Sequence, residues 1–191
     1  NVEETSTGRD ALSTATLGKG NALMHTRQYD ASVATEWTKL LTEITRTKPY
    51  FTPIAIRIFT YSSLALYEAV VPGMPSYQSM YAYMTGNTVS IDKKKDYYWP
   101  AAANAAVARV ASRIMLKYPA PNLTQVNALE ASLYNSYTSK ATPEQLQRSV
   151  EFGRYVGDFI YEWSMTDGTF NPDGSIAICP PFVSPGTPGS W

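Results

Sequence analysis

The segment 52–71 is apolar on almost every side of a helix, which sets it apart from the rest of the chain. Ile58 and Tyr61 share one helical stripe, while Ile56 and Phe59 lie on other faces. A helix that is apolar all round lies inside a protein, because no face of it favours water. The pattern therefore predicts that residues 52–71 form a buried central helix.

Further segments carry apolar residues at helical spacing and have recognisable starts or ends. They run from Asp30 to Arg46, from Trp99 to Tyr118, from Asn122 to Tyr137 and from Thr142 to about Asp167. Thr142-Pro143-Glu144-Gln145 has the form of a capping box with proline at the first helical position. No segment reads as a strand pair, so the sequence predicts an all-α bundle of about five helices around residues 52–71.

The 191 residues suit a single domain with irregular segments at both ends. Residues 1–29 are rich in Thr, Ser, Gly and Asn and are expected to form an irregular N-terminal arm. Residues 30–168 form the predicted helical bundle, and the Pro- and Gly-rich residues 169–191 form a tail or linker. The tyrosines of the long connection 73–96 predict that this connection is ordered and packed over the core.

The charge balance argues against two classes of partner. Lysine plus arginine and aspartate plus glutamate each number 16, so the formal net charge is zero. Because nucleic acids and anionic membranes attract an excess of positive charge, neither is an expected partner. No uninterrupted apolar run reaches the roughly 20 residues that a bilayer span needs, so no membrane span is predicted. Asn1-Val2-Glu3-Glu4 does not resemble a secretion signal, which is therefore either absent or already removed.

Arg57 and Glu68 are the only charged residues of the central segment. They lie about three helical turns apart on nearly the same side, too far from each other to pair. Each is therefore expected to find a partner on a neighbouring helix. We interpret both as internal structural charges, each in an ion pair that fixes the register of the helices, with a role in a functional site as the alternative.

Histidine and cysteine, which many catalytic and metal sites need, each occur once, as His25 and Cys179. A single cysteine excludes an internal disulfide and a multi-thiolate metal site, and one histidine does not supply the two Glu-x-x-His motifs of di-iron bundles. We interpret His25 as a solvated side chain and Cys179 as an inert thiol. The sequence accordingly predicts no catalytic residue, no metal ligand and no cofactor-binding residue in this chain.

The remaining patterns that suggest chemistry have simpler structural explanations. They are Gly18-Lys19-Gly20, the carboxylate pairs Glu36 with Glu43 and Asp158 with Glu162, and the run Lys93-Lys94-Lys95. The first lacks the spacing of a phosphate-binding loop. Carboxylates spaced along an amphipathic helix are also what a solvated face shows, and the lysine run is interpreted as an exposed loop cluster.

The helices also carry a series of motifs in a definite order. The series comprises Trp37, Pro53-x-x-x-Arg57, Ser63-Leu64-Ala65-Leu66-Tyr67-Glu68-Ala69-Val70, the Ala-rich helix closed by Pro119, Phe152-Gly153-Arg154 with Gly157, Asp167-Gly168, and Pro188-Gly189-Ser190-Trp191. Over about residues 30–191, this order resembles the N-terminal helical half of the vanadium-dependent haloperoxidase and phosphatidic-acid phosphatase (PAP2) related family.

The resemblance implies a parent enzyme that hydrolyses phosphoric monoesters or oxidises halide. Members of that family build the active site in a second, C-terminal helical half, from a Lys, an Arg-Pro, a Pro-Ser-Gly-His, and a further Arg and His. None of these motifs occurs here, so the resemblance implies that vanadate or phosphate binds the missing half. It also implies that Arg57 and Glu68 are structural, and it favours an exported or periplasmic location.

The sequence thus predicts a non-catalytic scaffold, inactive alone, whose partner is the missing C-terminal half or a second copy bound through an exposed apolar face. The alternative is an autonomous helical module that binds a partner protein or a small ligand through Tyr77 to Met84. A half-domain should expose a large apolar patch or self-associate, whereas an autonomous module should be monomeric and closed.

Overall fold

Six α-helices and two short 3-10 turns make up the part of the chain that the structure, a computed structural model, describes. The described residues are 25–48, 50, 52–118, 123–171, 173 and 175–177. The elements are η1 (Thr26–Gln28), α1 (Ser32–Thr47), α2 (Thr52–Val70), η2 (Val71–Gly73), α3 (Met80–Thr85), α4 (Trp99–Met115), α5 (Leu123–Tyr137) and α6 (Pro143–Ser164). Within these residues the only β-type pairing is a single bridge between Phe170 and Ile176. The predicted all-α bundle is confirmed.

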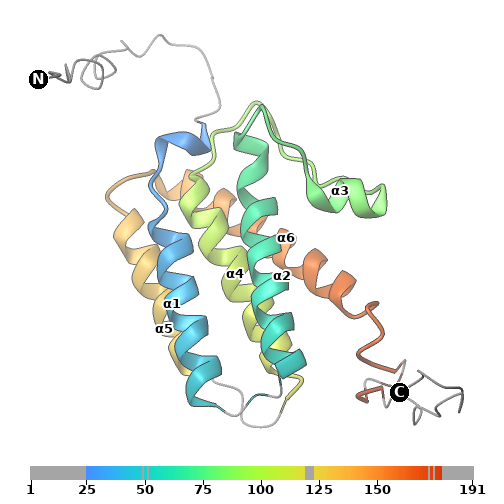
Figure 1. The fold of residues 1–191 in the computed structure, drawn as a ribbon. Coiled ribbons are helices and arrows are strands. Elements are labelled where there is room, and N and C mark those ends of the chain that lie inside the picture. Colours follow the sequence, from blue (N-terminus) through green and yellow to red (C-terminus); the bar gives the residue numbers. More distant parts are fainter. Residues whose placement is uncertain are drawn as a thin grey trace, which may run out of the picture.

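The helix that the bundle encloses most fully is α4. Thirteen of its seventeen residues are buried, against seven of nineteen in α2. Because seven of the seventeen α4 residues are alanines, α1, α2, α5 and α6 can all pack against it, and Figure 1 shows α4 in the middle of the bundle. The expected central position of residues 52–71 is therefore corrected, since α2 keeps an exposed stripe through Ile56, Thr60 and Ser63.

Two glycines one turn apart bring α6 very close to α4. A Cβ atom added to Gly153 would overlap the backbone carbonyl of Ala102. A Cβ atom on Gly157 would lie 2.7 Å from the Cβ atom of Arg109. The α4–α6 contact therefore depends on the absence of side chains at both positions, and α6 crosses behind α4 and α2 (Figure 1).

The ends of the helices follow local hydrogen bonds. The Thr142 hydroxyl accepts the Gln145 backbone N–H at 3.2 Å, which confirms the predicted start of α6. The Asp30 carboxylate accepts the Ser32 N–H at 2.9 Å at the start of α1. The last helix ends at Ser164, earlier than predicted, and the chain turns at Gly168, whose φ is 82°. The predicted start at Asn122 lies outside the described residues.

The long connection after α2 contains a short helix, α3, which projects from the bundle (Figure 1). The Ser79 hydroxyl caps its start by accepting the Ala82 N–H at 2.9 Å, and Gly86 ends it with a φ of 74°. Tyr81 is buried, but Tyr77 and Tyr83 are 63% and 89% exposed. The expectation that these tyrosines pack over the core is therefore wrong for Tyr77 and Tyr83. Tyr83 is exposed because a helix this short turns only one side toward the bundle, and Tyr77 lies in the turn before α3.

The last residues of the predicted N-terminal arm belong to the bundle. The Thr26 hydroxyl donates to the carbonyl oxygen of Val70 at 2.8 Å. The Tyr29 ring packs edge-on against Tyr98 with a centroid distance of 5.1 Å. The rest of that arm, residues 1–24, and the tail residues 178–191 lie outside the described part of the chain.

Candidate functional site

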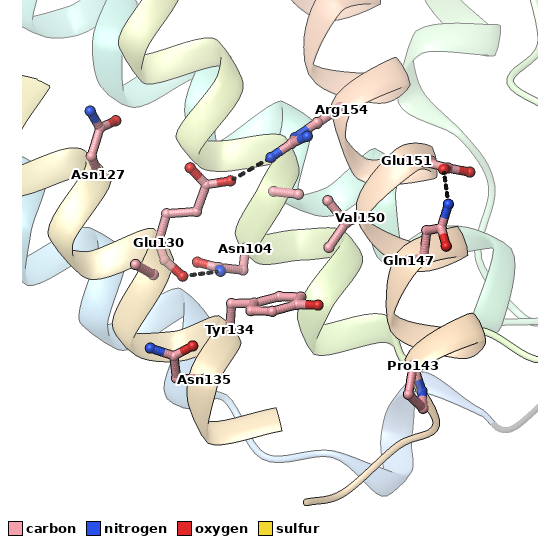
Figure 2. Close-up of a pocket in the computed structure, with 12 residues that line it drawn as sticks. Asn104, Asn127, Glu130, Tyr134, Asn135, Pro143, Gln147, Val150, Glu151 and Arg154 are labelled. Carbon is pink, nitrogen blue, oxygen red and sulfur yellow. Dashed lines mark hydrogen bonds and ion pairs between the residues drawn. The ribbon is translucent and has the colours of Figure 1, made fainter. Parts of the chain in front are cut away.

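A groove of about 610 Å³ runs between α5 and α6, with α4 as its floor (Figure 2). The two helices follow one another in sequence, but each packs on α4 with little direct contact between them. The walls are two stripes with the same helical spacing, Asn127, Glu130, Ala131 and Tyr134 on α5 and Gln147, Val150, Glu151 and Arg154 on α6. The groove is therefore lined by polar side chains together with much apolar surface, all held on rigid helices.

Asn104 lies at the floor of the groove and ties three helices together. It is 2% exposed, and its side-chain oxygen accepts the Trp37 indole N–H at 2.9 Å. Its amide nitrogen donates to the Glu130 backbone carbonyl, also at 2.9 Å. Because a buried amide is costly unless both of its ends are bonded, Asn104 fixes the position of α5 relative to α1 and α4.

Glu130 and Arg154 face each other across the groove (Figure 2). The closest oxygen and nitrogen atoms are 3.9 Å apart, so the two charges attract without a close hydrogen bond. Burial raises the pKa of Glu130, while Arg154 and Arg109 partly offset this effect. The groove thus holds one partly buried carboxyl group that water solvates poorly.

A second cavity of about 400 Å³ continues from the groove toward a charged cluster on α4 and α6. Asp158 accepts hydrogen bonds from Arg109 at 2.7 Å and from Arg113 at 2.6 Å, and Arg113 also binds Glu162 at 2.7 Å. Burial acts to raise the pKa of Asp158, but the two arginines outweigh it and hold the pKa below its usual value. The pair Asp158 and Glu162 therefore joins two helices.

The other carboxylate pair considered from the sequence lies on the outer face of α1. Glu36 pairs with Lys39 at 2.9 Å and Glu43 pairs with Arg46 at 2.8 Å, each within the same helix. All four side chains are largely exposed. These ion pairs contribute little to stability and do not bring Glu36 and Glu43 to a common site.

Arg57 is 6% exposed and holds the chain that follows α6. Its guanidinium forms an ion pair with Asp167 and donates to the Thr169 hydroxyl at 2.9 Å and to the Ser164 carbonyl at 3.0 Å. It also lies over the rings of Tyr61 and Phe170. The first half of α2 is thereby fastened to the segment 164–170.

Glu68 is 1% exposed and holds the start of α3. Its carboxylate accepts the Ser79 hydroxyl at 2.7 Å and the Tyr81 backbone N–H at 3.0 Å. The partners of Glu68 are therefore neutral donors, although a charged partner was expected from the sequence. Hydrogen bonds from neutral groups still compensate a buried carboxylate, because each N–H or O–H points at the negative charge.

The α3 face, defined as Met80, Tyr83 and Met84, is an apolar surface with no covering element among the described residues. The three side chains are spaced three and four positions apart on one side of α3 and are 51%, 89% and 46% exposed. On the opposite side, the Tyr81 ring packs against Phe159 at a centroid distance of 3.8 Å. The α3 face is therefore held in place by contacts on its reverse side.

The remaining sequence candidates lie apart from the groove. His25 borders a separate surface cavity with Arg27, Ser76 and Tyr77, and Lys93 to Lys95 are exposed. The described residues contain no group of three His, Cys, Asp or Glu side chains that could hold a metal ion. Cys179 and Gly18-Lys19-Gly20 lie outside the described part of the chain.

No known protein family, curated protein or solved structure matches this chain. Within the described residues, one helical stretch, Thr52–Gly73, is long and apolar enough to cross a membrane, with a mean hydropathy of 1.4. The core helix of a soluble protein meets the same criteria. In this fold 39% of the apolar window is buried, and the stretch packs against α4 and α6.

The groove was not predictable from the sequence. The one local signal was Asn104, a polar residue in the middle of the alanine run of α4. The spacing of Glu130 and Tyr134 on α5 is readable as a helical stripe, but it does not show which neighbour the stripe faces. The groove exists because α5 and α6 make little direct contact with each other, and that is a property of the tertiary fold.

Proposed function

We propose that this chain is a non-catalytic helical scaffold that supports a second helical half in a protein related to the vanadium haloperoxidase and PAP2 group. The proposal rests on the ordered motifs of the sequence and on what the fold does with two of them. Arg57 and Glu68, the charges of the Pro53-to-Val70 motif, are both buried and both used to hold other segments of the chain.

The burial and the bonding partners of Arg57 are the main support for this proposal. An arginine that binds phosphate or vanadate must present its N–H groups to the oxyanion. The terminal nitrogens of Arg57 instead bind Asp167, Thr169 and the Ser164 carbonyl, and the side chain is 6% exposed. This geometry supports a structural role and leaves the oxyanion chemistry to residues outside this chain.

In this proposal the α3 face is part of the surface on which the second half docks. Apolar side chains at spacing three and four on a helix are the anchors by which helices pack against one another. Contacts with Glu68 and Phe159 already hold α3 in position, so docking would order few additional residues.

Activity measurements on purified residues 1–191 test the scaffold role. We expect neither hydrolysis of p-nitrophenyl phosphate nor vanadate-supplemented oxidation of bromide by hydrogen peroxide above the buffer rate. Arg57→Met and His25→Ala should leave these background rates unchanged. An activity in the unaltered chain that either substitution abolishes would overturn the proposal.

The second candidate function is an autonomous module that binds a partner protein or small ligand through Tyr77 to Met84, favoured by the same exposed side chains. Sedimentation velocity and a fluorescent hydrophobic dye distinguish the two. If the chain is a scaffold, it should self-associate or bind the dye strongly. Both signals should decrease in the triple variant Met80→Gln/Tyr83→Gln/Met84→Gln. Leu116→Gln is the control, because Leu116 is 58% exposed at the far end of α4. A monomer that binds no dye would favour the autonomous module.

A further inference from the structure

We infer that the groove between α5 and α6 binds a neutral, hydroxyl-rich ligand of the size of a short oligosaccharide. The inference does not depend on the scaffold role, because it uses α4, α5 and α6 side chains that hold neither α3 nor the chain after α6. The groove volume of about 610 Å³ falls within the range of small-molecule pockets, about 300 to 1,000 Å³.

The groove offers hydrogen-bonding groups that the fold itself leaves unused. Among the described residues, the side chains of Asn127, Tyr134 and Asn135 make no hydrogen bond with one another or with the rest of the protein. An amide presents donors and an acceptor side by side, and a sugar hydroxyl both donates and accepts. Planar amide and hydroxyl groups therefore match a ligand with many hydroxyls.

Tyr134 supplies a flat apolar surface for the same ligand. Its ring extends from α5 across the groove toward α6 and is 36% exposed (Figure 2). A pyranose ring carries a face of C–H groups that packs against an aromatic ring, while its hydroxyls point outward to polar groups. On the α6 wall, Gln147 donates to Glu151 at 2.9 Å, which holds a second planar polar pair near the ring.

The Glu130–Arg154 pair is suited to share a ligand hydroxyl. At 3.9 Å the two groups are close in space but not hydrogen-bonded to each other. A hydroxyl placed beside them would accept from Arg154 and donate to Glu130, so both charges would gain a partner.

The charges of the groove disfavour anionic and polycationic ligands. Its charged residues are Glu130, Glu151 and Arg154, so the wall carries one more negative than positive group. An anionic ligand would meet this excess of negative charge. Because Arg154 faces Glu130 across the groove, a polycation would have to displace an existing pair.

A titration of the ¹⁵N-labelled chain, followed by NMR, tests the inference. The probes are maltotriose, cellotriose and N,N′,N″-triacetylchitotriose, with inorganic phosphate and spermidine as charged comparisons. We expect at least one of the three saccharides to shift α5 and α6 resonances in a saturable manner. No saturable shift with any saccharide, or shifts with phosphate or spermidine alone, would overturn the inference.

Substitutions place the binding in the groove. Tyr134→Ala should weaken binding about tenfold through loss of the stacking surface, whereas Tyr155→Ala, which removes an exposed tyrosine elsewhere on α6, should not weaken it. Glu130→Gln keeps the shape of the side chain and should weaken binding several-fold, so it serves as the test if Tyr134→Ala lowers the melting temperature. Unchanged affinity in a folded Tyr134→Ala or Glu130→Gln variant would contradict the assignment.

Discussion

Replacement of Arg57 with methionine should release the chain after α6 from the first half of α2. Methionine retains an apolar stem between Tyr61 and Phe170 but has no group that can bind Asp167 or the Ser164 carbonyl. The substitution therefore removes the charge and its hydrogen bonds while changing the packed volume as little as possible. We expect a clear loss of stability with the bundle still folded.

The expected magnitude follows from the burial of the two partners. Breaking a fully buried ion pair by removing one partner costs about 3 to 5 kcal/mol. The Asp167 side chain is 27% exposed, so water would partly solvate its carboxylate once Arg57 is gone. We therefore expect a loss of about 2 to 3 kcal/mol, which corresponds to a fall in melting temperature of about 4 to 12 °C for a chain of this size.

Urea denaturation followed by circular dichroism measures this loss, and a double-mutant cycle assigns it to the pair. Arg57→Met combined with Asp167→Asn should be less destabilised than the sum of the single variants, because the double variant leaves no unpaired charge. Arg46→Met is the control, since the surface pair of Arg46 with Glu43 should change stability by less than about 0.5 kcal/mol. If Arg57→Met is as mild as this control, the structural role of Arg57 is wrong.

Three further substitutions probe other contacts. Gly153→Ala should lower the free energy of unfolding by about 1 to 3 kcal/mol in urea, because its Cβ would overlap the Ala102 carbonyl; unchanged stability would contradict the close approach. Glu68→Ala should speed amide hydrogen exchange in α3 but not in α4; equal effects in both would show that Glu68 supports the whole bundle. Burial raises the pKa of Glu130 above its ordinary 4.5, so the folded state binds this proton more tightly than the unfolded state, and ionisation of Glu130 opposes folding as pH rises. Glu130→Gln should therefore melt higher than the unaltered chain at about pH 7, and the difference should vanish by about pH 4 in thermal scans; a difference independent of pH would refute this assignment.

The helices that the sequence predicted well have both periodicity and a local end signal. Thr142 with Pro143 marked the start of α6, and its hydroxyl makes the expected cap. The helix α3 was missed because six residues are too few to establish a period, although Ser79 and Gly86 bracket it. The existence of a helix was thus predictable where the hydrophobic periodicity extends over several turns.

The position of each helix in the bundle was less readable. Hydrophobicity ranked residues 52–71 as the centre, but the centre is α4, whose alanines are only weakly apolar. What decides the position is side-chain size, because small residues let several neighbours approach at once. Hydrophobic pattern alone therefore predicted burial of α2 on more sides than the fold provides.

For the site residues, too, part of the structure was predictable from the sequence and part depended on the tertiary fold. The need of Arg57 and Glu68 for partners was predictable from their charge in an apolar helix. The identity of those partners was not, because Thr169 lies 112 positions from Arg57 and the Glu68 partners are neutral donors from α3. The groove was still harder to predict, because it lies where α5 and α6 do not contact each other directly.

The two buried charges of α2 hold the two segments that extend beyond the bundle. Arg57 fastens the chain after α6 and Glu68 fastens α3, and eleven helical positions place them about 16 Å apart along the axis. Figure 1 shows both segments on the same side of the bundle. Burial of a charge is unfavourable unless it is fully bonded, so apolar residues at these positions would serve a free-standing bundle at least as well. Helix α2 thereby fixes the distance between the α3 face and the segment 164–170. The proposed scaffold role uses such a fixed distance, so this arrangement favours that role over an isolated binding module.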